Sequence, residues 1–528
     1  MGIMLIKKVS ASRISAKSNA LLPVFGLATV IFATDSYAFT WNAVPTLQFQ
    51  EIFSDNVALA PKGGEQAAFV SELSPGFSLS GQSPRTQFNL NYRMQNLYNS
   101  GGDDSVRIAN QLQQSSDTTF AKNLFFLNSS SSISQQNLSS TRLANDNING
   151  FNNSTTVNTF SLTPILTPHF GHFANANIRA NFNTVTTDAQ STAVNAISDT
   201  ITLQQTAQLN SGTDFKRVSW GLNFSNNESL RSGAEDVKFQ NADGIVRLAL
   251  SQNFSVFAQG GFSDNSFQSL TNNSRNGAFY TAGVRWTPSQ RYSIEAGYGN
   301  NSFITVNLTP IQRFSLSGTF RNRDIGLNTG NTFQVDMNYR TRQSIWSITH
   351  DNDTTTSQAI LLQQRIFNLV DPFGNAITNP VTSQPVQFAI NLPTLTNEVI
   401  TRKRWNFSVS YQTGKSTITA NAYNEDRVFQ ITRRNEEVRG LGASWNWQFE
   451  SKTSAFIAPN WQQSDNAASL IDATTSDFTR FDVAVGINRT INTWANGRLE
   501  FRHLDQSSDD TANGFTENRA TATVNMRF

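Results

Sequence analysis

Residues 518–528 read NRATATVNMRF, and polar and apolar side chains alternate from Arg519 to the last residue. Successive side chains of a β-strand point to opposite faces, so this segment predicts a strand with one apolar and one polar face. Such a strand suits a membrane wall that has lipid on one side and water on the other. The apolar positions are Ala520, Ala522, Val524, Met526 and Phe528.

The same alternation recurs along the chain. Each segment is weak evidence for a strand, but the recurrence favours a large all-β protein. Charged residues make up 15% of the chain and apolar residues 38%, both below the values usual for soluble domains. A chain poor in both suits a barrel wall one side chain thick. The clearest segments are 87–94, 218–224, 280–286, 333–340, 405–411, 441–449 and 481–487.

Short and long connections separate the predicted strands. Short turns at one rim and long loops at the other are the layout of outer-membrane barrels. We predict a transmembrane antiparallel β-barrel of about 24 strands (roughly 20–26), with short periplasmic turns and long extracellular loops. The short turns are 83–85, 167–169, 210–214, 287–290, 309–312, 413–415 and 451–452; the long loops are 99–104, 134–153, 187–197, 227–234, 264–276, 464–477 and 506–514.

Residues 1–38 have the features of an export signal. A basic leading region precedes the apolar run 21–33, and SYA at 36–38 has the small residues of a cleavage site. The alternative, an uncleaved anchor, is disfavoured because a spanning helix needs about 20 apolar residues. We therefore expect an outer-membrane barrel at 39–528, in a Gram-negative bacterium. This part is nearly neutral and lacks cysteine, so neither a basic nucleic-acid-binding face nor a disulfide is expected.

Residues 365–397 break the alternation. This stretch combines prolines, which argue against a central strand, with apolar residues, which argue against a free solvated loop. We predict that it packs on the extracellular mouth or folds into the lumen. Barrels of about 22 strands are usually plugged, so this loop and the Asn/Ser-rich loop 134–153 are the candidates for narrowing the lumen.

The polar faces of the predicted strands define the lumen. A charge facing lipid at the bilayer midplane costs about 2–4 kcal/mol, so charged residues at polar positions should face inward. Both signs occur among Asn, Gln, Ser and Thr, and such a lining suits hydroxyl-rich solutes such as sugars better than it selects ions. The predicted lumen-facing residues are Arg217, Asp336, Arg340, Asp482, Arg498, Glu500, Arg502, Arg519 and Arg527.

Catalysis and metal binding find little support in the sequence. His169 and His172 lack a neighbouring carboxylate, and His350 begins an acidic stretch without the glycine and distal glutamate of a calcium loop. A Ser–His hydrolase built on His503 would need an aligned nucleophile, base and orienting group, which abundant serine alone does not provide. We predict no catalytic site, no metal and no cofactor.

Residues 41–57 (WNAVPTLQFQEIFSDNV) and 73–77 (LSPGF) resemble outer-membrane proteins associated with PEP-CTERM/exosortase systems. AGYGNNSF at 296–303 and ENR at 517–519 also fit, although Asn300 and Asn301 stand where that family tends to carry a basic residue. The resemblance covers nearly all of the chain after residue 38. It implies an outer-membrane β-barrel from a gene neighbourhood tied to exopolysaccharide production and protein sorting.

Three functions remain open from the sequence. The first is a pore or export conduit associated with exopolysaccharide and PEP-CTERM systems, the second a structural or adhesive barrel with a filled lumen, and the third an outer-membrane hydrolase. The expected partners are outer-membrane lipid and lipopolysaccharide, and exopolysaccharide or its export components. Phe528 resembles the ending of bacterial outer-membrane barrels, which implies that it is the signal read by the barrel-assembly machinery.

Overall fold

The computed structural model describes residues 39–101, 106–137, 147–149, 154–188, 197–270, 275–363, 396–467 and 477–528. The predicted export signal and most of the 365–397 segment lie outside these residues. The first strands are β1 (Thr40–Ser54), β2 (Ala68–Gln82), β3 (Thr86–Asn99), β4 (Val106–Ala121), β5 (Phe125–Asn137), β6 (Ser154–Leu166), β7 (His169–Phe170), β8 (Ala174–Thr187), β9 (Thr200–Ser211), β10 (Val218–Arg231), β11 (Val237–Ala249) and β12 (Phe254–Ser266).

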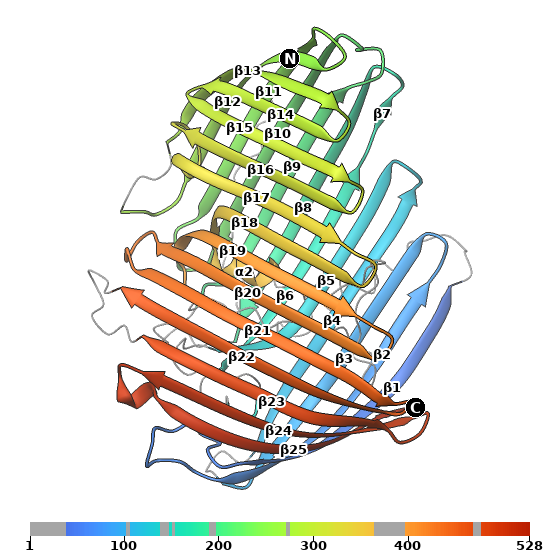
Figure 1. Cartoon of the computed structure of the whole chain (residues 1–528), viewed down its shortest axis with the longest axis vertical. Coiled ribbons are helices and arrows are strands. Elements are labelled where there is room, and N and C mark those ends of the chain that lie inside the picture. The colour runs from blue at the N-terminus through green and yellow to red at the C-terminus, as the bar shows by residue number, and fades with distance from the viewer. Residues whose placement is uncertain are drawn as a thin grey trace.

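The remaining elements complete one continuous sheet (Figure 1). They are β13 (Gly277–Ser289), β14 (Tyr292–Gly299), β15 (Asn301–Ile311), β16 (Phe314–Arg323), β17 (Gly330–Arg340), β18 (Ser344–Thr356), α2 (Ser357–Gln363), β19 (Val399–Gln412), β20 (Ser416–Phe429), β21 (Asn435–Glu450), β22 (Thr453–Ala467), β23 (Phe478–Thr490), β24 (Ala495–Ser508), η1 (Thr511–Asn513) and β25 (Phe515–Arg527).

Each strand pairs antiparallel with the next along the chain, and β1 pairs with β25 to close the sheet into a barrel. The strand β7 has only two residues and extends the turn before β8, so 24 strands form the wall, as the sequence predicted. Because the number of strands is even, the start of β1 and the end of β25 lie at the same rim, which is the rim of the short turns. Among the predicted short turns, 83–85, 413–415 and 451–452 match the observed turns residue for residue.

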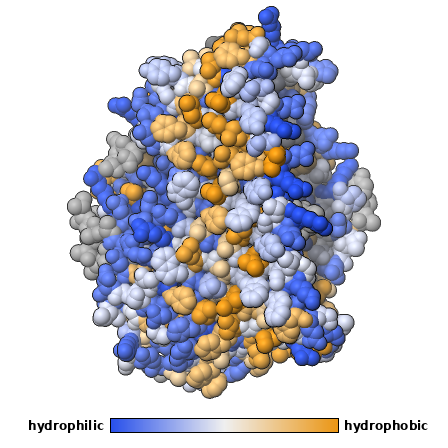
Figure 2. All heavy atoms as spheres, viewed as in Figure 1, coloured by the Kyte–Doolittle hydropathy of each residue, from blue (hydrophilic) through white to orange (hydrophobic). Residues whose placement is uncertain are grey.

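Apolar side chains line the outside of the barrel. In β1, Phe49 and Phe53 are exposed, while Gln50, Ile52 and Ser54, at the alternate positions, are partly or fully covered. Figure 2 shows the result on the visible face as a hydrophobic band that runs down the middle of the molecule, with polar residues on both sides of it. A closed antiparallel barrel with such a band is a wall that fits a lipid bilayer. No helix among the described residues is long and apolar enough to cross a membrane.

Aromatic residues gather near the short turns. Trp494 and Phe528 stack with their ring centroids 6.3 Å apart, and Trp447 lies 5.4 Å from Phe449. Rings at this level form the interfacial girdle expected of an outer-membrane barrel. The backbone N–H of Phe528 donates to Pro45 at 3.0 Å, so the last residue is bound to the first strand.

Side chains reinforce the junction between β1 and β25 at the long-loop end. The hydroxyl of Ser54 donates to Glu517 at 2.6 Å, and Asn518 donates to Asp55 through its backbone and its side chain at 2.7 and 2.8 Å. Backbone pairing at this seam covers nine residue pairs, against fifteen between β1 and β2. These side-chain contacts therefore strengthen the shorter of the two ladders that hold β1.

Candidate functional site

Four of the predicted lumen-facing residues pair with one another on β23 and β24. They occupy positions that alternate with exposed apolar side chains, so they lie on the inner face. Arg502 donates to Asp482 through Nε at 2.7 Å, and Arg498 forms an ion pair with Glu500. Opposite charges on the inner wall thus neutralise each other locally.

The other predicted residues are spread around the barrel. Arg519 donates to Asn149 at 3.2 Å near the long-loop end. Asp336 accepts a hydrogen bond from Asn338 at 2.6 Å and is exposed, as is Arg340 at the end of β17. Arg217 and Arg527 are exposed at the short-turn rim, and Arg217 precedes the first residue of β10. The nine predicted residues therefore form no single cluster.

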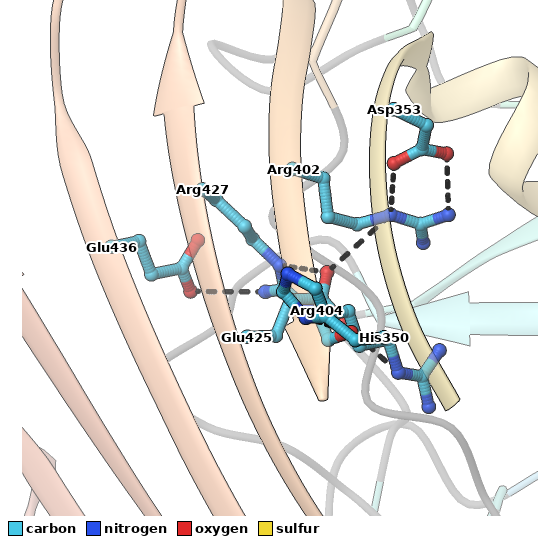
Figure 3. A network of polar contacts seen from close by, with 7 residues as sticks. All are labelled: His350, Asp353, Arg402, Arg404, Glu425, Arg427 and Glu436. Carbon is cyan, nitrogen blue, oxygen red and sulfur yellow. Dashed lines mark hydrogen bonds and ion pairs between the residues drawn. The ribbon is translucent and has the colours of Figure 1, made fainter. Parts of the chain in front are cut away.

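A denser group of charges, which the sequence reading did not single out, lies on the inner faces of β18 to β21 (Figure 3). Glu425 is at its centre. Arg427 donates to Glu425 at 2.8 Å, and Arg404 and Arg402 approach it at 3.6 and 4.0 Å. Only 3% of the Glu425 side chain and 1% of the Arg427 side chain are exposed.

Two further carboxylates complete this group. Asp353 accepts two hydrogen bonds from Arg402, at 2.8 and 3.0 Å, and Glu436 lies 3.3 Å from Arg427. Three arginines therefore meet three carboxylates, and the buried group is neutral. The alternation of 405–411 continues back to residues 404 and 402. This continuation was the sequence signal that could have placed both arginines on the inner face. We call these six residues the charge network.

Arginine, aromatic and glycine residues form a second recurring arrangement on the inner wall. An aromatic ring packs against a glycine of the next strand, and an arginine lies over the ring. Arg404 lies 5.9 Å from the Tyr423 ring centre, and a Cβ atom at Gly440 would be 2.3 Å from Tyr423 Cζ. The other examples are Arg247 on Phe257 over Gly283, and Arg498 on Phe456 over Gly486.

Gly440→Val is expected to destabilise the barrel by about 1–3 kcal/mol, because the new side chain would displace the Tyr423 ring toward the lumen. The measurement is the midpoint of urea unfolding in lipid vesicles. Gly318→Val, on the outer face of β16, is the control for adding a valine to a strand, since nothing lies within 4 Å of a Cβ at that position. Equal losses in both variants would contradict a ring held against Gly440.

The helix α2 crosses the lumen near the long-loop end. One side packs on β19 and β20, and the other packs on β6 and β8. Ten wall strands separate β8 from β19 in one direction and twelve in the other, so these walls are nearly opposite. Figure 1 shows α2 between the front and back strands. The two clusters are Ile360 with Ile400 and Phe429, and Leu361 with Val157, Val185 and Ile197.

The segment before β19 ties the same two walls together. Asn397 accepts from the backbone N–H of Ser198 at 2.8 Å, and its carbonyl accepts from Arg231 of β10. Glu398 accepts from the backbone N–H groups of Ile431 and Thr432, both at 2.8 Å, in the loop after β20. Polar contacts thus accompany the apolar clusters that hold α2.

Residues 147–149, the described middle of the predicted 134–153 loop, also point inward. Ile148 is 4% exposed and belongs to an inner-face cluster with Ile52 and Val70. Asn147 donates to Gln95 at 2.7 Å, and Asn149 donates to Glu517 at 2.9 Å. This segment therefore occupies part of the lumen beside the seam.

The opposite end of the lumen is accessible to water. Asn338 and Arg340 near the short turns are exposed although they lie on the inner face, and Arg285 retains 42% of its side-chain exposure. The charge network, by contrast, is mostly buried toward the long-loop end. The inner wall is therefore polar and exposed near the short-turn rim, and α2 contacts two walls of the lumen near the long-loop end.

The histidines do not converge. His350 stacks on Trp405 at 4.3 Å on the outer face, and His172 contacts Thr213 at 3.0 Å. His503 contacts Asn518 at 2.8 Å, and His169 is exposed in β7. Within the described ranges, no group of three or more His, Cys, Asp or Glu side chains could hold a metal ion.

The closed wall, its apolar band and its aromatic girdle define an outer-membrane β-barrel of a Gram-negative bacterium. No protein-family model and no curated protein matches the chain.

Several solved barrels are distantly similar. The FrpB iron transporter of Neisseria meningitidis (F3-3 variant) is 11% identical, over 92% of this chain and 82% of that one, with a TM-score of 0.44. The siderophore receptor PirA of Pseudomonas aeruginosa is 9% identical, over 93% and 80%, with a TM-score of 0.40. A loop-deleted OmpT of Vibrio cholerae is 9% identical, over 93% and 100%, with a TM-score of 0.29. Similarity at this level carries no argument about function.

Proposed function

We propose that this barrel is a gated outer-membrane conduit for a hydroxyl-rich polymer, with exopolysaccharide as its cargo. The observation that carries the proposal is α2, a helix of seven residues that lies between two walls of a polar lumen and contacts them through two small apolar clusters. A helix held by so few contacts can be displaced, and its displacement would widen the lumen near the long-loop end.

The lining also supports a polymer cargo. Amide and hydroxyl groups of Asn, Gln, Ser and Thr alternate with paired charges, so the wall offers many neutral hydrogen bonds. The sequence resemblance to PEP-CTERM-associated barrels points to the same cargo, since those proteins belong to exopolysaccharide loci. We include assembly through Phe528 and contact with lipopolysaccharide in the proposal.

The test is single-channel conductance in a planar bilayer. Intact protein and a variant with residues 357–398 replaced by a short Gly-Ser turn would be compared. We expect small or brief openings in the intact protein, and large steady openings in the variant that added polysaccharide blocks. Silence of both proteins, with folding verified by heat-shifted gel mobility, would contradict the conduit and favour the structural or adhesive barrel with a filled lumen.

A further inference from the structure

Two arginines of β16 stand apart from the paired charges of the lumen. Arg321 and Arg323 lie two residues apart on the inner face near the long-loop end, and both are partly buried. Neither has a carboxylate oxygen within 4.0 Å among the described residues, and Arg323 donates only to the Leu327 carbonyl, at 3.4 Å. Their positive charges oppose each other.

The arginines of the charge network differ from this pair because they have carboxylate partners. Arg402 and Arg427 each contact at least one carboxylate, and the network is neutral. The β16 pair instead carries two positive charges that no carboxylate of the described residues contacts. Guanidinium groups bind carboxylate, sulfate and phosphate groups through parallel hydrogen bonds, so the pair is suited to an external anion.

A flat aromatic surface adjoins this pair. Phe303 of β15 is directly opposite Arg321 in the strand register. Its ring lies against Gly297 of β14, where an added Cβ would be 2.9 Å from Phe303 Cε1. One face of the ring is thus against the wall.

Phe303 differs in one respect from the three rings that arginines cover. Its ring stacks on that of Phe257, with the ring centroids 5.9 Å apart, but in the described part of the chain no arginine lies over it, and the residue is only partly buried. An apolar ring face beside hydrogen-bonding groups is the usual way in which a pocket holds a ligand that has both apolar and polar surfaces. The C–H face of a pyranose ring is such a surface.

We propose that Phe303, Arg321 and Arg323 form a binding subsite in the lumen for an acidic sugar unit of the cargo. Arg321 and Arg323 bind its carboxylate, and the sugar ring stacks on Phe303. This inference rests on the proposed function, because it specifies that the transported polymer carries uronic acid units.

The test measures binding separately from conductance. Oligogalacturonate, a neutral malto-oligosaccharide and inorganic phosphate would each be titrated into the intact protein in lipid nanodiscs by calorimetry. We expect oligogalacturonate to bind more tightly than the other two. Arg321→Gln with Arg323→Gln should weaken it at least about tenfold, which corresponds to the loss of about 1.4 kcal/mol. Phe303→Leu should weaken oligogalacturonate but leave phosphate binding unchanged.

Arg340→Gln is the matched control, because Arg340 is an inner-face arginine of the neighbouring strand, exposed at the opposite end of the lumen. An equal loss in this control, or no loss in the double variant, would overturn the subsite. Equal binding of the neutral sugar would do the same, and binding of phosphate alone would overturn the sugar assignment. Binding by a protein that never conducts would leave the subsite standing and contradict the conduit.

Discussion

Replacing Glu425 with glutamine is expected to lower the free energy of unfolding by about 3 kcal/mol or more. The carboxylate faces three guanidinium groups, and its side chain is 3% exposed. Removing its charge leaves this mostly buried network with a net positive charge. Urea unfolding in lipid vesicles, followed by tryptophan fluorescence, measures the change.

A double-mutant cycle separates this loss from general damage. Arg427→Gln alone should also destabilise, but the double variant should lose less than the sum of the two, because it restores neutrality. Asp336→Asn is the control, since that carboxylate is on the inner wall and exposed. Additive losses in the double variant would show that Glu425 and Arg427 do not act as a pair.

Replacing Ile360 and Leu361 with aspartate is expected to open the conduit without shortening the chain. Each residue is buried in an apolar cluster on one wall. A carboxylate there would cost about 3 kcal/mol without a hydrogen-bond partner. This cost is enough to reduce the population of the docked helix roughly a hundredfold. Single-channel recordings should then show the large openings expected of the 357–398 replacement.

The control for this variant keeps the helix apolar. Ile360→Leu with Leu361→Met conserves volume and hydrophobicity, so the small or brief openings of the intact protein should persist. If the aspartate variant were folded and as closed as the intact protein, α2 would not be the block. The filled lumen would then depend on other segments, among them residues 147–149.

The sequence predicted the wall well because the period of a strand is local information. Alternation along β23 to β25 was enough to place Asp482, Arg502 and Arg519 on the polar face, and the turn pattern gave the strand number. Cross-strand contacts were not predictable in this way. Arg427 meets Glu436, and Tyr423 covers Gly440, only because of a register that neither strand specifies alone.

The helix α2 could not be predicted from the sequence, for a different reason. SQAILLQ has no long helical period, and a helix of seven residues is unstable by itself. It forms where two walls supply apolar surface on both sides, so the helix depends on the barrel that surrounds it. The prediction of an inward segment concerned 365–397, of which the structure describes only the last residues, and α2 lies just before it.

The pairing of β1 with β25 can form only late in the folding of the barrel. Ser54 and Glu517 are 463 residues apart, so their contact must wait until nearly the whole chain has been made and inserted. Until then the growing sheet keeps two unpaired edges, which are the sites where strands of other chains can add. Contacts between distant residues form slowly, and exposed edges favour aggregation in the meantime. The risk of aggregation is therefore greatest before the barrel closes. It depends on the rate of closure and not on the stability of the finished barrel.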